Sequence, residues 1–588
     1  MTPPLEILQS TFGFPAFRGV QADVVARVMA GQRTAAIMPT GAGKSLCYQL
    51  PSVALPGTCI VISPLIALMH DQLRAAEAVG IRAATLTSVD ENRAETVERF
   101  RAGKLDLLYA APERASQASF RGLLRESPIC LFAIDEAHCV SEWGHDFRPD
   151  YRLLRPMLDD FANVPRLALT ATADAHTRED ICDQLGIPRE GLIVAGFDRP
   201  NIRYHMAPRA GTTQQVADVV AAHPGPGIVY VQSRKGTEIL AAQLGSKGRA
   251  VRAYHAGLDA DVRRRNQADF VRSEDMVMVA TIAFGMGIDK PDVRFVAHAG
   301  LPKSIEAYYQ ETGRAGRDGD PAGAYLFWGA DDFAKARQRL SEVEESRVAG
   351  EKVRLQALGA LVETPGCRRA ILLRHFGDPA PENCANCDNC LNPPKLSNVT
   401  ELARKFLSAV YRTGQSFGVT HLEDVLTGRA NDRAMKLGHD QLSVFGIVEG
   451  EDAAMIKPVA RALLLRGALE TNEHGGLMFG ADARAILKGE ADVDLIEQPR
   501  RERRSKRGGT VPNPVGDPLF EALRECRRTI AAEAGLPPYV IFHDSTLREM
   551  AALRPVTLGG LGQITGVGAR KLDAYGNAFL AVIRDTAA

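Results

Sequence analysis

The sequence lacks an excess of charge of either sign, because 71 Lys and Arg residues balance 71 Asp and Glu residues among 588. Any affinity for nucleic acid must therefore come from local grooves or patches. The sequence also lacks an apolar run near the roughly 20 residues that span a bilayer, so no membrane segment is expected. The N-terminal MTPPLEILQS has no cationic stretch before an apolar block, unlike a secretory signal, and the cytoplasm is the expected compartment.

The ten cysteines do not form a pattern typical of disulfide scaffolds. Six are scattered, several of them beside aliphatic residues, and are expected to be buried thiols: Cys47, Cys59, Cys130, Cys139, Cys182 and Cys526. The other four form a cluster: Cys367, Cys384, Cys387 and Cys390. In a reducing compartment such a cluster indicates a metal. Four thiolates can close a tetrahedral zinc site, although a CxxCxxC triad also occurs in iron–sulfur proteins.

No repeat of fixed period is present, and the length corresponds to about four domains. Between residues 30 and 330, helix-like stretches alternate with short apolar runs such as CIVIS, LFAID, LALTA, GIVYV and FVAHAG. Apolar runs without polar alternation are typical of parallel strands that are covered on both faces. We expect two α/β units, joined near the turn-rich residues 196–205.

The remainder of the chain predicts smaller units. Residues 341–363 have helical periodicity and precede the cysteine cluster. Residues 401–490 contain three helical patterns and the hairpin-like TNEHGGLMFG, which together indicate a winged helix whose recognition helix would be 433–446. Residues 498–516 are basic and then rich in Gly and Pro, as in a flexible linker. Residues 517–588 return to helical periodicity and are long enough for a small bundle.

The segment MPTGAGKS lies between the strand candidate TAAIM and the helix candidate LCYQL, which is the setting of a phosphate-binding loop. Its glycines Gly41 and Gly43 would let backbone amides wrap the phosphates. Lys44 would supply charge to the terminal phosphates, and the Ser45 hydroxyl would coordinate magnesium. Met38 replaces the first glycine of the strict pattern, so a glycine-rich turn that binds no nucleotide is the alternative.

Two further motifs favour a nucleotide site. In LFAIDEAH, Asp135 would hold the magnesium and Glu136 would polarise the attacking water. In QETGRAGRDG, either Arg314 or Arg317 could be the cationic finger that stabilises the transferring phosphoryl group, an effect of roughly a thousandfold or more. These arginines belong to the second α/β unit, so they would complete the site only when the two units close.

These motifs, in this order, resemble a superfamily 2 helicase and specifically the RecQ family of DNA helicases. The supporting strings are FGFPAFRGVQ, SPLIALMHDQ, SEWGHDFRPDY, LTATA and AFGMGIDKPDVRFVAH. The resemblance covers essentially the whole chain and implies two RecA-like parallel-sheet domains, a zinc-binding helical module, a winged helix and the C-terminal helical domain known as HRDC. The expected boundaries are 1–200, 201–340, 341–396, 397–492, a linker at 493–516, and 517–588.

The same resemblance implies an ATP-dependent 3′–5′ DNA helicase that uses Mg²⁺ and holds Zn²⁺ on the four cysteines. It implies that Gln21 reads the adenine edge while Phe14 and Arg18 flank its face, alongside the phosphate-loop residues, which include Thr40. The implied partners are single-stranded, forked and branched DNA and single-stranded-DNA-binding protein. The implied processes are DNA recombination, repair and replication.

The string SEWGHDFRPDY mixes flat apolar faces with cations, through Trp143, His145, Phe147 and Arg148. Such a mix suits stacking on unpaired bases, worth about 1 to 3 kcal/mol per base. In RecQ proteins the similar loop senses single-stranded DNA and switches on hydrolysis. Core packing is the alternative for Trp143. For the whole chain the alternatives are an RNA helicase, disfavoured by this loop and the cysteines, and a non-enzymatic scaffold, disfavoured by the intact motor residues.

Overall fold

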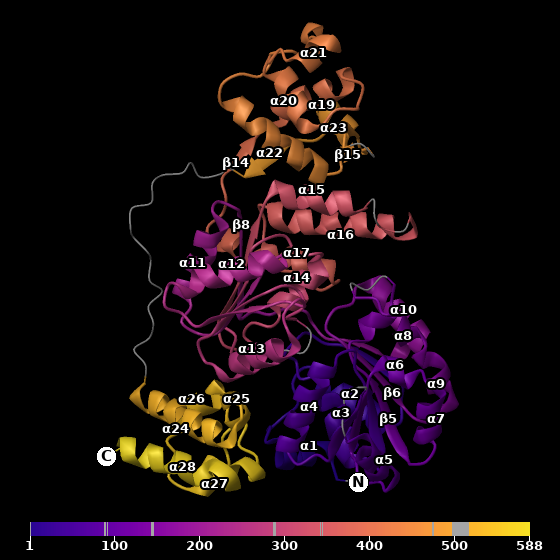
Figure 1. Cartoon of the computed structure of the whole chain (residues 1–588), viewed down its shortest axis with the longest axis vertical. Coiled ribbons are helices and arrows are strands. Elements are labelled where there is room, and N and C mark those ends of the chain that lie inside the picture. The colour runs from indigo at the N-terminus through magenta and orange to yellow at the C-terminus, as the bar shows by residue number, and fades with distance from the viewer. Residues whose placement is uncertain are drawn as a thin grey trace.

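The computed structural model describes residues 2–87, 90, 92–142, 146–285, 290–340, 343, 345–472, 475–496 and 517–587. Its units, seen in Figure 1, are lobe 1 (2–194), lobe 2 (202–339), the cysteine module (345–391), the winged-helix unit (396–496) and the terminal bundle (517–587). The winged-helix unit lies at one end of the molecule, and lobe 1 and the terminal bundle lie at the other. No helix in these ranges is long and apolar enough to cross a bilayer.

Lobe 1 is a seven-stranded parallel sheet with helices on both faces. Its strands, in spatial order, are β3 (Ala83–Leu86), β4 (Leu107–Ala110), β2 (Thr58–Ile62), β5 (Ile129–Ile134), β6 (Arg166–Thr170), β1 (Thr34–Ile37) and β7 (Leu192–Val194). The helices are α1 (Pro4–Ile7), η1 (Leu8–Phe12), α2 (Gln21–Met29), α3 (Leu46–Ala54), α4 (Ile66–Ala78), α5 (Arg93–Arg101), α6 (Pro112–Ala115), α7 (Ala118–Leu124), η2 (Ala137–Val140), α8 (Pro149–Arg152), α9 (Leu154–Asp160), α10 (Ala175–Leu185) and η3 (Arg189–Gly191).

The central strands of lobe 1 are apolar at every position because both faces of the sheet are covered. Successive strand residues point to opposite faces, and the two faces belong to different cores. Ile60 and Ile62 of β2 lie in one core, whereas Cys59 and Val61 lie in the other. The prediction of buried parallel strands is therefore confirmed. The loops that follow β1 and β5 emerge at the same carboxyl edge, which is where open α/β sheets bind ligands.

Lobe 2 repeats this design with a six-stranded parallel sheet. Its strands, in spatial order, are β10 (Val251–Tyr254), β11 (Val277–Ala280), β9 (Gly227–Tyr230), β12 (Phe295–His298), β13 (Ala322–Trp328) and β8 (Ile202–Pro208). Its helices are α11 (Thr212–Ala222), α12 (Arg234–Gly245), α13 (Ala260–Arg272), α14 (Ile305–Thr312) and α15 (Ala330–Arg339). The interlobe segment, residues 195–201, joins β7 to β8 and overlaps the junction expected near 196–205, whose second half belongs to β8.

The cysteine module consists of α16 (Glu345–Glu363), α17 (Arg368–His375) and α18 (Asp388–Leu391). It has little core of its own. Its apolar residues instead merge with those of β8 and α14 of lobe 2. Asp388 accepts a hydrogen bond from the Met206 amide of β8 at 2.8 Å and pairs with Arg368 at 3.2 Å. The module is thus built onto lobe 2.

The winged-helix unit contains β14 (Leu396–Asn398), α19 (Thr400–Arg412), α20 (Val419–Leu426), α21 (Asp432–Lys436), η5 (His439–Gln441), α22 (Glu451–Leu465), β15 (Leu469–Thr471), β16 (Leu477–Phe479), α23 (Ala483–Lys488) and β17 (Asp494–Ile496). The predicted hairpin is confirmed, because β15 and β16 pair in antiparallel fashion. Residues 494–496 pair with β14 and do not belong to the linker that was expected to start at 493. The rest of that linker, 497–516, lies outside the described residues.

The predicted continuous recognition helix at 433–446 is wrong. Helix α21 ends at Lys436, and Gly438 follows with a φ of 69°, a left-handed conformation that terminates helices. The chain then turns inward at His439, whose Nδ1 lies 2.8 Å from Nε2 of His421 within the unit. Periodicity alone did not reveal this break, because a glycine can also sit inside a helix at modest cost.

The terminal bundle comprises α24 (Pro518–Ala534), α25 (Pro538–Ile541), α26 (Asp544–Leu553), α27 (Leu558–Leu561) and α28 (Ala569–Ala587), packed around one apolar core. It contacts both lobes. At lobe 1, the Gly566 amide donates to the Gly13 carbonyl at 3.1 Å, and Arg570 donates to the Glu77 carbonyl at 2.8 Å. At lobe 2, Arg548 pairs with Asp320 at 2.6 Å.

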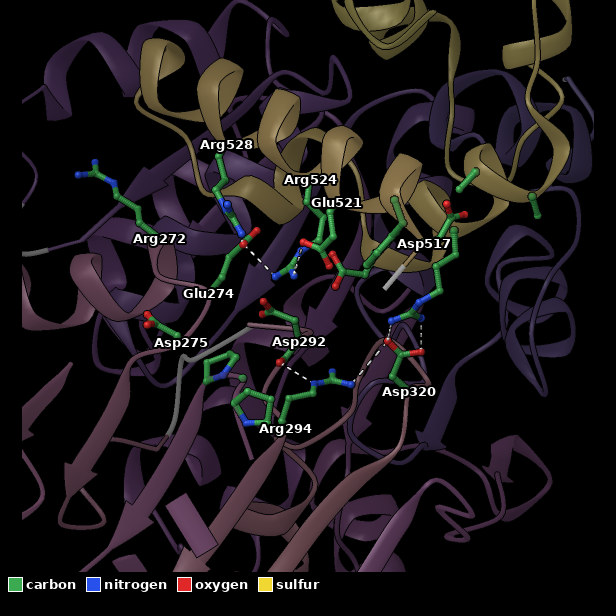
Figure 2. Close-up of a pocket in the computed structure, with 18 residues that line it drawn as sticks. Arg272, Glu274, Asp275, Asp292, Arg294, Asp320, Asp517, Glu521, Arg524 and Arg528 are labelled. Atoms are coloured by element: carbon green, nitrogen blue, oxygen red, sulfur yellow. Dashed lines mark hydrogen bonds and ion pairs between the residues drawn. The ribbon is translucent and has the colours of Figure 1, made fainter. Parts of the chain in front are cut away.

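A charged cleft of about 1190 Å³ separates the bundle from lobe 2 (Figure 2). On the wall of the cleft, Glu274 of lobe 2 forms ion pairs with three arginines of α24. The N–O distances are 2.9 Å to Arg524 and 2.7 Å to both Arg527 and Arg528. Burial acts to raise the pKa of Glu274, but the arginines hold it below its ordinary value. Four ion pairs from the bundle to Glu274 and Asp320 therefore connect this face of the bundle to lobe 2.

We expect Glu274→Gln to weaken docking of the bundle on lobe 2 by about 3 kcal/mol, because it leaves three arginines around an uncharged amide. The measurement is energy transfer between one label on α24 and one on lobe 2, which should report a longer mean distance. The control is Asp275→Asn, since Asp275 lines the same cleft without an ion pair to the bundle among the described contacts. An unchanged distance in the Glu274 variant would contradict the assignment.

Candidate active site and metal centre

The phosphate-binding loop connects β1 to α3. Gly41 and Gly43 have φ values of 85° and 75°, a conformation that glycine adopts without strain. Lys44 donates from Nζ to the Met38 carbonyl at 3.3 Å. Within the described part of the chain, the buried hydroxyl of Thr40 has no hydrogen-bond partner. A loop of this shape, with a buried hydroxyl in the loop and a lysine just before a helix, fits the phosphates of a nucleotide.

Gln21 is tied to this loop. Its Nε2 donates to the Ala42 carbonyl at 2.9 Å and to the Gly43 carbonyl at 3.3 Å, while its Oε1 accepts from the Arg18 amide. The Arg18 guanidinium lies 5.8 Å from the centroid of the half-buried Phe14 ring. The structure therefore places Gln21 against the phosphate loop and groups Arg18 and Phe14 beside it.

The acidic pair follows β5 at the same sheet edge. The Asp135 Oδ1 accepts from the Glu136 amide at 2.9 Å, and the Asp135 carbonyl accepts from the Tyr151 hydroxyl at 2.9 Å. Glu136 has a φ of 48°, the left-handed region that is costly for a residue with a side chain. Such strain persists only where the surrounding structure imposes it, and it is concentrated at functional sites.

His138 links this acidic pair to β6, a contact that sequence reasoning missed. Its Nδ1 lies 2.7 Å from the Thr170 hydroxyl and 3.3 Å from Oε2 of Glu136. Burial lowers the pKa of His138 to about 4, so the ring is neutral near pH 7. Both residues lie in motifs noted above, DEAH and LTATA, but their adjacency depends on the order of β5 and β6 in the sheet.

The two arginines of lobe 2 occupy different places. Arg317 lies against the phosphate loop, since a Cβ on Gly41 would stand 3.4 Å from the Arg317 Cγ. Arg314 is 4% exposed, and its Nη2 would stand 3.3 Å from a Cβ on Gly285, inside lobe 2. Arg314 also counteracts part of the burial that raises the pKa of Tyr230 to about 12. The sequence did not distinguish Arg314 from Arg317, whereas the structure places only Arg317 beside Gly41 of the phosphate loop and buries Arg314 in lobe 2.

The loop after DEAH is described only in part. Trp143 and His145 lie outside the described residues. Phe147 is half-buried with the Arg152 guanidinium 5.3 Å from its ring centroid. Arg148 donates from Nη1 to the Pro64 carbonyl at 3.0 Å and from Nη2 to Asp146 at 3.2 Å. Arg148 therefore ties this loop to the segment after β2.

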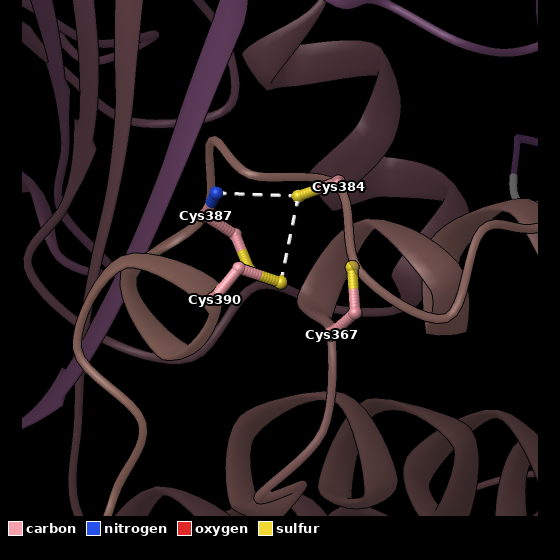
Figure 3. A group of neighbouring side chains, drawn as sticks. All are labelled: Cys367, Cys384, Cys387 and Cys390. Atoms are coloured by element: carbon pink, nitrogen blue, oxygen red, sulfur yellow. Dashed lines mark hydrogen bonds between the residues drawn. The ribbon is translucent and has the colours of Figure 1, made fainter.

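The four cysteines converge at the start of α17 (Figure 3). Their Sγ atoms all lie within 4.8 Å of one another, and those of Cys384 and Cys390 are 3.9 Å apart. Zinc–sulfur bonds of about 2.3 Å in a tetrahedron place sulfurs about 3.8 Å apart. Backbone amides of Ala370 and Cys387 donate to the sulfurs of Cys367 and Cys384. The donor set fits a closed structural zinc site.

Comparison with protein-family models agrees with this division of the chain. Residues 18–181 match the DEAD/DEAH box helicase model, and residues 212–319 match the helicase conserved C-terminal domain. The two facing lobes therefore define a helicase motor. Three further models match the rest of the chain: RecQ zinc-binding at 330–391, the RQC domain at 393–504 and the HRDC domain at 517–583.

Relatives are similar over nearly the full length. The ATP-dependent DNA helicase RecQ of Haemophilus influenzae is 42% identical, over 99% of this chain and 96% of the relative. The proteins of the same name from Pasteurella multocida and Bacillus subtilis are 40% and 38% identical, covering 99% and 98% of this chain and 93% and 98% of their own. The chain belongs to the RecQ family of ATP-dependent DNA helicases. Its cofactors are accordingly ATP with Mg²⁺ and, at the four cysteines, Zn²⁺.

We expect Cys387→Ala to lose the zinc and unfold the cysteine module, because Cys387 is fully buried and zinc contributes about 10 kcal/mol or more to folding such a module. Metal analysis by mass spectrometry should find one zinc and no iron in the unaltered protein and less zinc in the variant. Cys526→Ala, which alters a cysteine of the terminal bundle, is the control. Iron in the purified protein, or full zinc in the Cys387 variant, would refute the assignment.

Proposed function

We propose that this helicase hydrolyses Mg-ATP between its two lobes and thereby moves 3′ to 5′ along single-stranded DNA, separating the duplex ahead of it. The observation that carries the proposal is the contact between the phosphate loop of lobe 1 and Arg317 of lobe 2. A nucleotide bound there would touch both lobes, so its hydrolysis would change how they meet. One base-pair step costs on the order of 1.4 kcal/mol, so only modest coupling is needed.

We assign the chemical roles as follows. The phosphate-loop amides and Lys44 hold the phosphates, Ser45 and Asp135 hold the magnesium, and Glu136 polarises the attacking water. Neutral His138 lies between Glu136 and Thr170, so a movement of the end of β6 would be transmitted to the acidic pair. The loop that contains Trp143 senses unpaired bases and switches on hydrolysis, and Arg148 connects that loop to the segment after β2.

The biological setting remains a proposal based on the family. We propose that the protein works in the cytoplasm, in DNA recombination, repair and replication, on forked and branched DNA. Single-stranded-DNA-binding protein is the proposed protein partner, because unwinding produces the strands that it coats.

An unwinding assay tests the proposal directly. Duplexes with a 3′ tail, a 5′ tail, a fork or a four-way junction are incubated with ATP, and we expect release from the 3′-tailed, forked and branched substrates only. Lys44→Ala should bind tailed DNA as well as the unaltered protein does but should neither hydrolyse ATP nor unwind. The control is Lys104→Ala, since Lys104 is exposed away from the loop. Unwinding of the 5′-tailed substrate alone would reverse the proposed polarity.

We assign the transition-state contact to Arg317 rather than Arg314, because Arg317 adjoins the phosphate loop while Arg314 is buried in lobe 2. Arg317→Ala should lower kcat for ATP by about a thousandfold, with little change in the melting temperature. Arg314→Ala should lower the melting temperature, because it leaves a cavity in lobe 2. A fall in kcat of less than tenfold for the Arg317 variant would rule the assignment out.

A further inference from the structure

Arg199 of the interlobe segment joins the two halves of the nucleotide site through backbone carbonyls. Its Nη1 donates to the carbonyl of Thr40 in the phosphate loop at 2.7 Å and to that of Gly313 at 3.3 Å. Its Nη2 donates to the carbonyls of Ala315 at 3.0 Å and Gly316 at 2.9 Å. One half-buried guanidinium thus holds lobe 1 and lobe 2 at once.

The carbonyls that Arg199 contacts in lobe 2 lie on the arginine loop, residues 313–317. Gly313 immediately precedes Arg314, and Gly316 immediately precedes Arg317. Asn201 adds a second contact from the interlobe segment, donating to the Gly316 carbonyl at 2.8 Å. The backbone of the arginine loop is therefore held on both sides of Arg314 and directly before Arg317.

The two lobes are in close contact at this point. A Cβ on Gly313 would stand 3.2 Å from the Thr40 Cβ, tighter than ordinary packing. A planar guanidinium presents several donors in a fixed fork, whereas a lysine ammonium is a compact point charge on a flexible stem. Holding four carbonyls from two lobes therefore requires arginine.

The interlobe segment is itself held by the cysteine module. Arg369 of α17 donates to the carbonyls of Arg199 at 3.2 Å and Ile202 at 2.8 Å. Phe197 stacks on Phe376 with ring centroids 4.6 Å apart, and the Tyr309 hydroxyl donates to the Phe197 carbonyl at 2.7 Å. Arg199 thus extends from a segment whose backbone is braced by both the cysteine module and lobe 2.

We propose that Arg199 is a positioning residue for ATP hydrolysis, which keeps the arginine loop in register with the phosphate loop so that Arg317 reaches the nucleotide. All of the guanidinium donors described here are used by carbonyls, so Arg199 acts through these loops. The proposal rests on the role of Arg317 proposed above. It goes beyond that role because it places the control of finger position in the segment between the lobes.

The test compares Arg199→Ala and Arg199→Lys with Arg203→Ala, an exposed arginine on the neighbouring strand β8. DNA-stimulated ATP hydrolysis is measured for kcat and KM, with the melting temperature and zinc content as measures of folding. We expect both Arg199 variants to lose about a hundredfold in kcat with a much smaller change in KM, as for a misplaced catalytic group. Arg203→Ala should match the unaltered protein. Arg199→Lys keeps the charge, so wild-type kcat in that variant would overturn the proposal.

A double-mutant cycle separates positioning from general stabilisation. In an Arg317→Ala background, Arg199→Ala should cause no further loss of kcat, because the residue that it positions is gone. If the two losses multiply, Arg199 acts independently of Arg317 and the proposal fails, while the role of Arg317 stands. If Arg317→Ala alone has little effect, the assignment of the finger fails instead.

Discussion

The arrangement of this protein depends on the close approach of two loops that belong to different lobes. The phosphate loop and the arginine loop meet where Gly41, at a φ of 85°, leaves room for the side chain of Arg317. A residue with a side chain at position 41 would be strained by this φ value, and its Cβ would be in direct contact with that arginine. On the roles proposed above, the catalytic residues come from both lobes, so the site would be complete only when the two loops are this close.

The accessory units brace the two lobes by different means. The cysteine module shares an apolar core with lobe 2 and holds the interlobe segment through Arg369 and Phe376. The terminal bundle instead relies on ion pairs at lobe 2 and on backbone contacts at lobe 1. The partly exposed pair Arg548–Asp320 is weakened by salt, while the largely buried Glu274 cluster is screened much less. Charged groups can exchange one partner for another, whereas the groups of a shared apolar core cannot. The cysteine module is therefore a permanent part of the motor, and the bundle is attached by contacts that can be exchanged.

Much of the local structure followed from patterns in the sequence. The runs around β1, β2, β5 and β6 are strands because sheets that are buried on both faces need apolar residues at every position. The phosphate loop and the cysteine cluster were found because phosphate and zinc chemistry demand particular residues at short spacing. The prediction of a continuous recognition helix at 433–446 was wrong because a single left-handed glycine, Gly438, ends the helix despite the helical periodicity. The predicted start of the linker at 493 was wrong because β17 pairs with β14, and a pairing between residues so far apart in the chain cannot be seen in local sequence.

The sequence by itself determined the class of fold, the nucleotide motifs and the metal ligands, since each is encoded in residues that are close neighbours along the chain. Only the tertiary structure decided which arginine adjoins the phosphate loop, that His138 meets Thr170, and that Arg199 spans both lobes. Those contacts depend on the order of strands in each sheet and on the angle between the lobes. These contacts between residues far apart in the chain arise from the packing of the whole molecule, and no short stretch of sequence specifies them.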